Sequence, residues 1–239
     1  MTDSISVYKE KLAEKQGEIE ILRKIIEMVS YNWDLKDILQ SAVKIVHTYT
    51  KSDSCLIYLV GRNQLILEAS QNPRRSLGKI TLQKGEGITG WVAKHKKTVM
   101  LPEKAYTDDR FKLFNNLPED QFESFLSVPV VFKSNIIGVI NIQNRRRRNY
   151  LKNQILFLEA IACQIGGAIE NARLVSETDI LKNALETRKI IEKAKGILMS
   201  KNNLTETQAH KLLNKKSMDV RKSLKEVAEA VILSEDLSP

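Results

Sequence analysis

Apolar side chains along residues 5–33 recur every seven positions, while the positions between them are mostly Lys, Glu and Gln. This spacing predicts one amphipathic helix with a narrow apolar stripe over residues 1–30. Such a stripe favours a parallel coiled-coil dimer; the alternative is a helix packed on its own domain. One row of the stripe holds Ile5, Leu12, Ile19, Ile26 and Trp33, and the second row, broken at Lys15, holds Tyr8, Leu22 and Val29.

The pattern changes after residues 32–34, which we expect to end this helix. Asp34 has the short acceptor side chain of an N-cap, so a second helix is predicted over 35–47. Short apolar runs bounded by polar turns then predict antiparallel strands. Pro129 suggests an edge strand or a bulge, because proline cannot donate a ladder hydrogen bond. The predicted strands are 55–60, 65–69, 80–82, 99–101, 125–132 and 136–142, with hairpin turns at 61–64 and 133–135.

A long helical pattern follows the last strand. No proline and no helix-ending glycine interrupts it, so we predict one long helix or two stacked helices from about 152 to 200. The adjacent Gly166 and Gly167 indicate a close approach by a neighbouring helix. No run of about 18 apolar residues is evident, which predicts no membrane span. The fold class is therefore α+β: an antiparallel sheet flanked by helices, between an N-terminal helix and a helical tail.

The tail contains two capping boxes, at Thr205–Gln208 and Ser223–Glu226. Together with Asn202 and Asn203, where the long helix is expected to end, they predict a three-helix bundle. The predicted domains are 1–30, the N-terminal helix; 31–172, the sheet domain; and 173–239, the connecting helix and the tail.

The excess positive charge lies in this tail. Residues 188–225 hold eleven Lys or Arg against three acidic residues, a net charge of +8 out of +9 for the whole chain. Clustered cations favour nucleic acid, because neutralising phosphates releases counterions. A solvated basic face without a partner is the alternative.

The tail resembles the ANTAR domain, a bacterial RNA-binding module, in an ordered set of positions within 179–235. The resemblance implies binding of paired RNA hairpins in leader transcripts by a homodimer, which prevents terminator formation. The matching positions are Arg188, Ala194, Lys195, Gly196, Leu198, Met199, Glu206, Ala209, Leu212, Leu213, Met218, Val227 and Ala228. The candidate RNA-binding residues are Arg188, Lys195, Gly196, Lys201, Thr205, Lys211, Lys215, Lys216 and Arg221.

Residues 30–172 resemble a GAF domain. The resemblance rests on the glycine-rich run at 85–93, on 109–111, on 124–130 with Pro129, and on 137–141. It implies a sensor that binds a small-molecule effector or a partner between the sheet and the polar loop 102–121. Packing in the core is the alternative role for several of the candidate pocket residues. These candidates are Tyr58, Trp91, Asp109, Phe111, Ser127 and Asn141.

No catalytic site, metal site or cofactor is predicted. His47, His95 and His210 lack ligand-like spacing, and Cys55 and Cys163 lie far apart in apolar stretches, so both are expected to be buried thiols. The cysteine usage and the absence of a signal-like N-terminus predict a cytoplasmic location. The run 145–148, four arginines, is a solvated turn or a surface for RNA or acidic phospholipid.

These observations together predict a transcription antitermination regulator whose sensor domain controls RNA binding. The alternative is a DNA-binding transcription factor, in which three basic helices imitate a helix-turn-helix. An enzyme that uses the sensor pocket is a third class, and the lack of neighbouring cysteines disfavours a thiol-dependent one.

Overall fold

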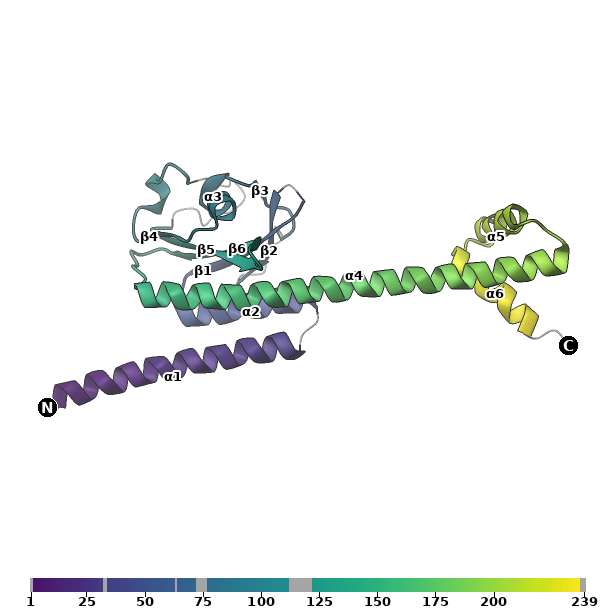
Figure 1. Cartoon of the computed structure of the whole chain (residues 1–239). Helices are drawn as coiled ribbons and strands as arrows, with labels where there is room; N and C mark the ends of the chain where they lie inside the picture. The colour runs from purple at the N-terminus through teal and green to yellow at the C-terminus, as the bar shows by residue number, and fades with distance from the viewer. Residues whose placement is uncertain (1, 32–33, 63, 72–76, 112–121, 237–239) are drawn as a thin grey trace. The chain divides into compact units, whose positions relative to one another are not determined.

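The structure is a computed structural model that describes residues 2–31, 34–62, 64–71, 77–111 and 122–236. The chain divides into two compact units, Met1–Leu174 and Val175–Pro239, and the long helix α4 (Lys152–Asn202) contributes to both (Figure 1). The division lies two residues after the domain boundary expected from the sequence.

A six-stranded antiparallel sheet forms the centre of the first unit. The strand order is β3-β2-β1-β6-β5-β4, and every neighbouring pair is antiparallel. All six predicted strands are present, each within two residues of the expected bounds. They are β1 (Ser54–Val60), β2 (Gln64–Ser70), β3 (Thr81–Gln83), β4 (Val99–Leu101), β5 (Ser124–Phe132) and β6 (Asn135–Asn144).

Pro129 lies in β5 and pairs with Val139 of β6. The outer neighbour β4 covers only residues 125–127 of β5, so at Pro129 this strand has no partner on its other side among the described residues. The register also shifts between Val130 and Val131. A proline is tolerated at such a place, where one side of the strand is unpaired in the described part of the sheet and a bulge follows.

Helices cover both faces of the sheet, and alternate residues of β1 point to opposite cores. Cys55 and Ile57 pack with α2 (Leu35–Thr50) and with the first part of α4. Leu56 and Tyr58 pack on the other face with α3 (Gly87–His95) (Figure 1). Asp34 caps α2 as predicted, since its side chain accepts hydrogen bonds from the backbone N–H groups of residues 36 and 37.

Helix α1 (Thr2–Tyr31) packs on its own domain with a face other than its heptad stripe. Ile25 is buried in the same core as α2, and Ile21 packs against that core. The stripe residues Leu12, Ile19 and Ile26 are all more than half exposed. The side chains of Ile5 and Val29, and Trp33 as a whole, lie outside the described residues. The coiled-coil dimer therefore stays a prediction, with the described part of its stripe open to solvent.

Two expectations about α4 were wrong. The Gly166 position is approached by strand β5 rather than by a helix: a Cβ atom there would lie 3.1 Å from both Val130 Cγ1 and the Val131 carbonyl oxygen. Cys163 is exposed, because it lies on the helix face turned away from the sheet, whereas Cys55 is buried as expected. Burial raises the pKa of the Cys55 thiol to about 12.

Helix α4 also contains an 18-residue window that is long and apolar enough to cross a membrane, contrary to the sequence expectation. This result rests on the length and composition of the helix alone. Inside the protein, 44% of the window is buried. Ile161, Ile165 and Ile169 from this region are fully buried in the sheet core. The apolar character of the helix is accounted for by that packing, since the core helix of a globular domain passes the same test.

The second unit is a small three-helix arrangement. Its helices are the end of α4, α5 (Glu206–Val220) and α6 (Leu224–Asp236). Asn203, in the left-handed region at φ 54°, follows the end of α4. Both predicted capping boxes are formed. Its core is a small cluster of buried side chains. Ala194, Leu213, Val227 and Ala228 are buried in it, and Ile190, Ile191, Leu198, Leu224, Val231 and Ile232 pack against them.

Candidate functional site

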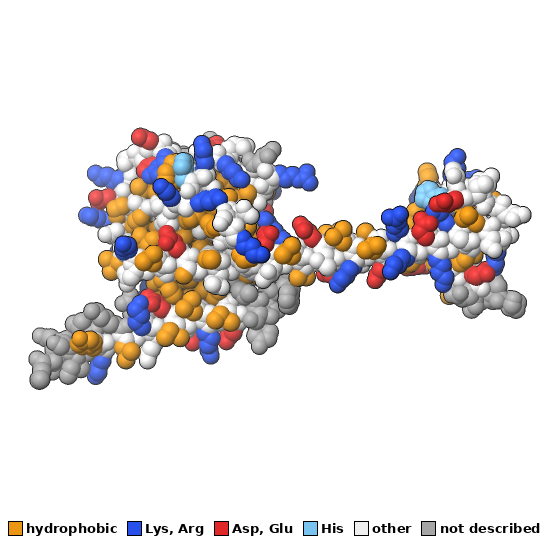
Figure 2. Space-filling view, in the orientation of Figure 1, with side chains coloured by type: hydrophobic (Ala, Val, Ile, Leu, Met, Phe, Trp, Pro, Cys, Tyr) orange, Lys and Arg blue, Asp and Glu red, His pale blue; other side chains and the backbone are white. Residues whose placement is uncertain are grey.

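Apart from the buried Lys195, the candidate basic residues of the second unit lie on the outside of its three helices. Figure 2 shows Lys and Arg side chains, interspersed with Asp and Glu, on the described surface of this unit. Eight of the nine candidate RNA-binding residues are exposed. They are Arg188, Gly196, Lys201, Thr205, Lys211, Lys215, Lys216 and Arg221.

Five of these cations have no ion pair within the described residues: Arg188, Lys211, Lys215, Lys216 and Arg221. Lys211 and Lys215 are four residues apart on α5 and lie on one helix face. Met218 continues that row and is 79% exposed. This row combines free positive charge with an apolar side chain, which suits a phosphate backbone and an adjacent base or sugar.

Lys195 differs from the other candidates, because it is buried and paired. Its Nζ atom lies 2.9 Å from Glu192 Oε2 and 2.7 Å from Glu206 Oε1. The Glu206 carboxylate, followed by that of Glu192, raises the pKa of Lys195, and the ammonium lowers the pKa of Glu206. The side chain thus joins the end of α4 to the start of α5, and its ammonium is not presented to solvent as a phosphate contact.

Lys201 is also engaged within the unit, since it forms an ion pair with Glu235 of α6. Thr205 caps α5: its hydroxyl accepts from the backbone N–H of Gln208, and the Gln208 side chain accepts from the backbone N–H of Thr205. These two candidates therefore hold helix ends in place. The number of Lys and Arg residues in a segment does not show which of them form ion pairs, as Lys195 and Lys201 do.

Gly196 leaves a bare patch of helix backbone on this surface. A Cβ atom added there would meet no atom within 4 Å. A glycine inside a helix is explained either by close packing of a neighbouring element or by close approach of a ligand to the backbone. No described part of the chain packs against it, so the open space suits an approaching ligand.

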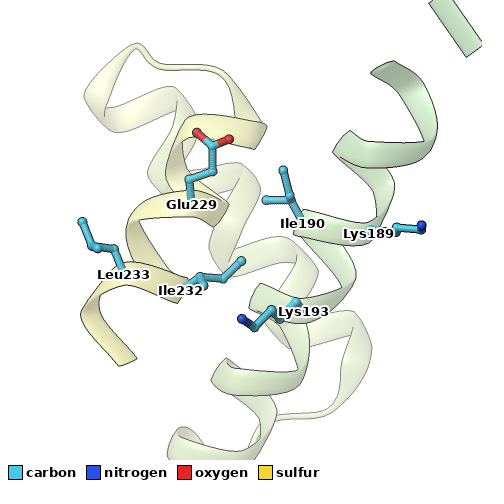
Figure 3. A pocket seen from close by; sticks show the side chains of 6 residues that line it. All are labelled: Lys189, Ile190, Lys193, Glu229, Ile232 and Leu233. Carbon is cyan, nitrogen blue, oxygen red and sulfur yellow. The ribbon is translucent and has the colours of Figure 1, made fainter. Parts of the chain in front are cut away.

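A shallow hollow lies beside these residues, between the end of α4 and α6 (Figure 3). It has a volume of about 430 Å³. Its lining is mainly apolar, with two lysines from α4 and one glutamate from α6. The six lining residues are Lys189, Ile190, Lys193, Glu229, Ile232 and Leu233.

In the first unit, three candidate sensor residues belong to the buried interior. Ser127 Oγ donates to Asn141 Oδ1 at 2.7 Å, and Asn141 Nδ2 donates to Thr89 Oγ1 at 2.7 Å. Tyr58 is buried in the core under α3. The network links β5, β6 and α3 across the sheet face, so Ser127 and Asn141 have a structural role in the geometry seen here.

Trp91 and Phe111 are only partly buried, and Asp109 is exposed. Trp91 stacks on His95 with ring centroids 4.2 Å apart, and the Arg110 guanidinium carbon lies 4.9 Å from the centre of the Trp91 ring. Asp108 holds Arg110 in a bidentate ion pair at 2.8 Å. Thr89 and Arg110 were not among the candidates from the sequence, although Thr89 lies in the glycine-rich run 85–93 and Arg110 lies in the 109–111 motif.

Helix α3 was likewise not predicted; it begins inside the glycine-rich run 85–93, which holds three glycines. Each has a local reason: Gly85 and Gly87 adopt positive φ, and a Cβ at Gly90 would lie 2.4 Å from the Gln83 carbonyl oxygen. No group of three or more His, Cys, Asp or Glu that could hold a metal ion occurs among the described residues.

Comparison with known proteins assigns both units. The GAF domain model matches residues 34–169, and the ANTAR domain model matches residues 179–232. The chain is 29% identical to the GAF domain of an Acinetobacter phosphoenolpyruvate-protein phosphotransferase, with a TM-score of 0.59; the match covers 67% of this chain and 97% of that structure.

The chain is also similar, over shorter stretches, to two curated regulators. It is 39% identical over 75 residues to the transcriptional regulatory protein PdtaR of Mycobacterium tuberculosis, a match that covers 31% of this chain and 37% of that protein. It is 42% identical over 65 residues to the nitrate regulatory protein of Klebsiella oxytoca, covering 27% of this chain and 16% of that protein. The chain thus spans well under half the length of these relatives. Since the GAF match extends over more than half of its residues, the chain belongs to the GAF domain family, and an ANTAR domain follows its GAF domain.

Proposed function

We propose that this protein is a cytoplasmic transcription antitermination regulator that binds RNA through its ANTAR domain. The observation that carries the proposal is the row of exposed cations on α5, together with Arg188, inside the matched ANTAR residues; none of them has an ion pair within the described residues. The similarity of the chain to two regulators supports it. The ligand we propose is a pair of RNA hairpins in a leader transcript, held so that a terminator does not form.

The test is a binding titration of the full chain with three probes of equal length: a paired-hairpin RNA, a single hairpin and duplex DNA. We expect the paired-hairpin RNA to bind most tightly. The logarithm of its affinity should fall linearly with the logarithm of the salt concentration, with a slope of about −1 for each phosphate that is neutralised. Equal affinity for duplex DNA would instead favour the DNA-binding alternative.

We propose further that the protein acts as a homodimer. Two exposed apolar rows support this: Leu12, Ile19 and Ile26 on α1, and Leu181 with Leu185 on α4. Their seven- and four-residue spacings are those of a helix that pairs with another helix. Sedimentation equilibrium of Leu181→Glu and Leu12→Glu variants tests the two rows separately, and a wild-type chain that stays monomeric at all concentrations contradicts the proposal.

The GAF domain is proposed to sense an effector and to control RNA binding. Trp91 and Phe111 are the candidate contacts, since they are partly buried and lie on the same side of the sheet as α3. A thermal-shift screen of small molecules, followed by Trp91 fluorescence, identifies a ligand. A true effector changes hairpin affinity in the full chain and loses that effect in a Trp91→Ala variant.

A further inference from the structure

A second basic site lies in the GAF domain, where β6 leaves the sheet. Four consecutive arginines, residues 145–148, and Lys51 surround a hollow of about 510 Å³. The other lining residues are Asp53 and Asn144, so five cationic side chains face one carboxylate. The volume is within the range of about 300–1,000 Å³ that small-molecule sites occupy in proteins.

The turn that carries these arginines is held in place from several sides. The backbone N–H of Arg145 donates to Asp53 Oδ2 at 2.7 Å, and the backbone N–H of Arg148 donates to the Pro102 carbonyl oxygen at 2.9 Å. Arg148 Nη1 also donates to the Lys51 carbonyl oxygen at 3.1 Å, and its guanidinium carbon lies 4.9 Å from the centre of the Tyr150 ring. The segment is therefore a preorganised turn, so a ligand that binds it orders little additional chain.

The positive charge of the hollow is largely uncompensated. Arg147 pairs with Glu103 at 3.3 Å, but both side chains are well exposed, so the pair contributes little. Within the described residues, Lys51, Arg145 and Arg146 have no ion pair, and Asp53 accepts from the Arg145 backbone. Like charges held this close repel one another, and a multiply charged anion would relieve that repulsion.

We propose that this hollow binds the di- or triphosphate group of a small molecule. Guanidinium groups present fixed pairs of donors that match phosphate oxygens, and neighbouring phosphates can engage several of them at once. The observations favour a small ligand over a nucleic-acid backbone, because the cations surround one concave hollow rather than a long stripe. The ring of Tyr150, which follows this turn, is buried and covered by Arg148, so it offers no face for a base.

The test uses the full chain and inorganic tripolyphosphate in isothermal titration calorimetry. We expect saturable binding with one site per chain. An Arg145→Gln/Arg146→Gln variant should weaken binding by about tenfold or more, because it removes charge-assisted hydrogen bonds. The matched control is Lys94→Gln/Lys97→Gln, which removes the same charge from an exposed part of the same domain. Circular dichroism checks folding, and Arg146→Gln alone replaces the double variant if that variant does not fold.

Further arms of the experiment separate the sources of the phosphate. Displacement of tripolyphosphate by a nucleoside triphosphate supports the proposal, as does the expected difference between the two variants. Equal weakening in both variants would overturn it, because general charge would then account for the binding. Absence of saturable binding also overturns it, as does binding only to vesicles containing phosphatidylinositol bisphosphate. The proposal is also overturned if the wild type does not bind tripolyphosphate and the arginine variant loses affinity for hairpin RNA. The turn would then belong to the RNA-binding surface.

Discussion

The ammonium nitrogen of Lys195 lies 2.7 Å from Oε1 of Glu206, across the junction between α4 and α5. Lys195 is almost fully buried, while Arg188, seven residues earlier on the same helix, is exposed and has no ion pair within the described residues. These two basic residues were grouped in the sequence as RNA contacts, and their surroundings give them different roles.

Replacing each residue separates the two roles. Lys195→Ala should lower the thermal unfolding temperature by a few degrees, since it removes the pairs with both Glu192 and Glu206. Arg188→Ala should leave that temperature within about a degree and weaken hairpin RNA binding several-fold. Circular dichroism melting and fluorescence anisotropy measure the two effects. If Lys195→Ala abolishes RNA binding at unchanged stability, the ammonium acts as a direct ligand contact.

The same pair predicts a pH dependence of stability. The carboxyl pKa of Glu206 is lowered from its ordinary 4.5, so its contribution is present above about pH 4.5 and is lost as the pH falls through the folded-state pKa. The pKa of Lys195 is raised from 10.5, so its contribution is present below that pH and is lost as the pH rises through the higher folded-state pKa. The melting temperatures of the wild type and of Glu206→Gln should therefore differ most between about pH 4.5 and pH 10.5, and they should become equal in acid. A difference that persists unchanged at pH 3 contradicts the assignment.

Local signals in the sequence predicted local structure well. The capping boxes at Thr205 and Ser223 placed the starts of α5 and α6, because a cap depends on residues three positions apart. The neighbours of Gly166 and the exposure of Cys163 depend instead on which face of α4 meets the sheet, and no local pattern specifies that face. For the same reason, the charge count could not show that Lys195 meets Glu206, since their contact depends on the angle between two helices.

The open space at Gly196 leads to a prediction about RNA approach. Gly196→Ala should stabilise helix α4 by about 1 kcal/mol, because alanine is the better helix former and its Cβ meets no atom. If RNA lies against this backbone, the added methyl group should weaken hairpin binding several-fold in spite of the higher stability. Ser200→Ala, an exposed change on the next turn, is the control. Unchanged affinity in Gly196→Ala means that RNA does not approach at this point.

The free lysines of α5 predict the salt dependence of binding. Lys211→Gln and Lys215→Gln should each reduce the slope of log affinity against log salt by about one, and their effects should add if each contacts its own phosphate. Lys84→Gln, which removes an exposed charge from the GAF domain, should leave the slope unchanged. Anisotropy titrations at four salt concentrations measure these slopes. Equal reductions in all three variants would indicate a general effect of net charge and no defined interface on α5.

The adjacent glycines of α4 give a matched pair of stability variants in the GAF domain. At Gly166, an added Cβ lies 3.1 Å from the Val131 carbonyl oxygen, and this sheet backbone cannot easily move. Gly166→Ala should therefore destabilise the domain by about 1–3 kcal/mol, as overpacking does in other cores. At Gly167 the nearest atom is on the Phe132 ring at 3.6 Å, an ordinary contact, so Gly167→Ala should gain up to about 1 kcal/mol from helix propensity. Urea denaturation of the full chain measures both changes. A stabilising effect of Gly166→Ala would mean that β5 does not lie against this turn of α4.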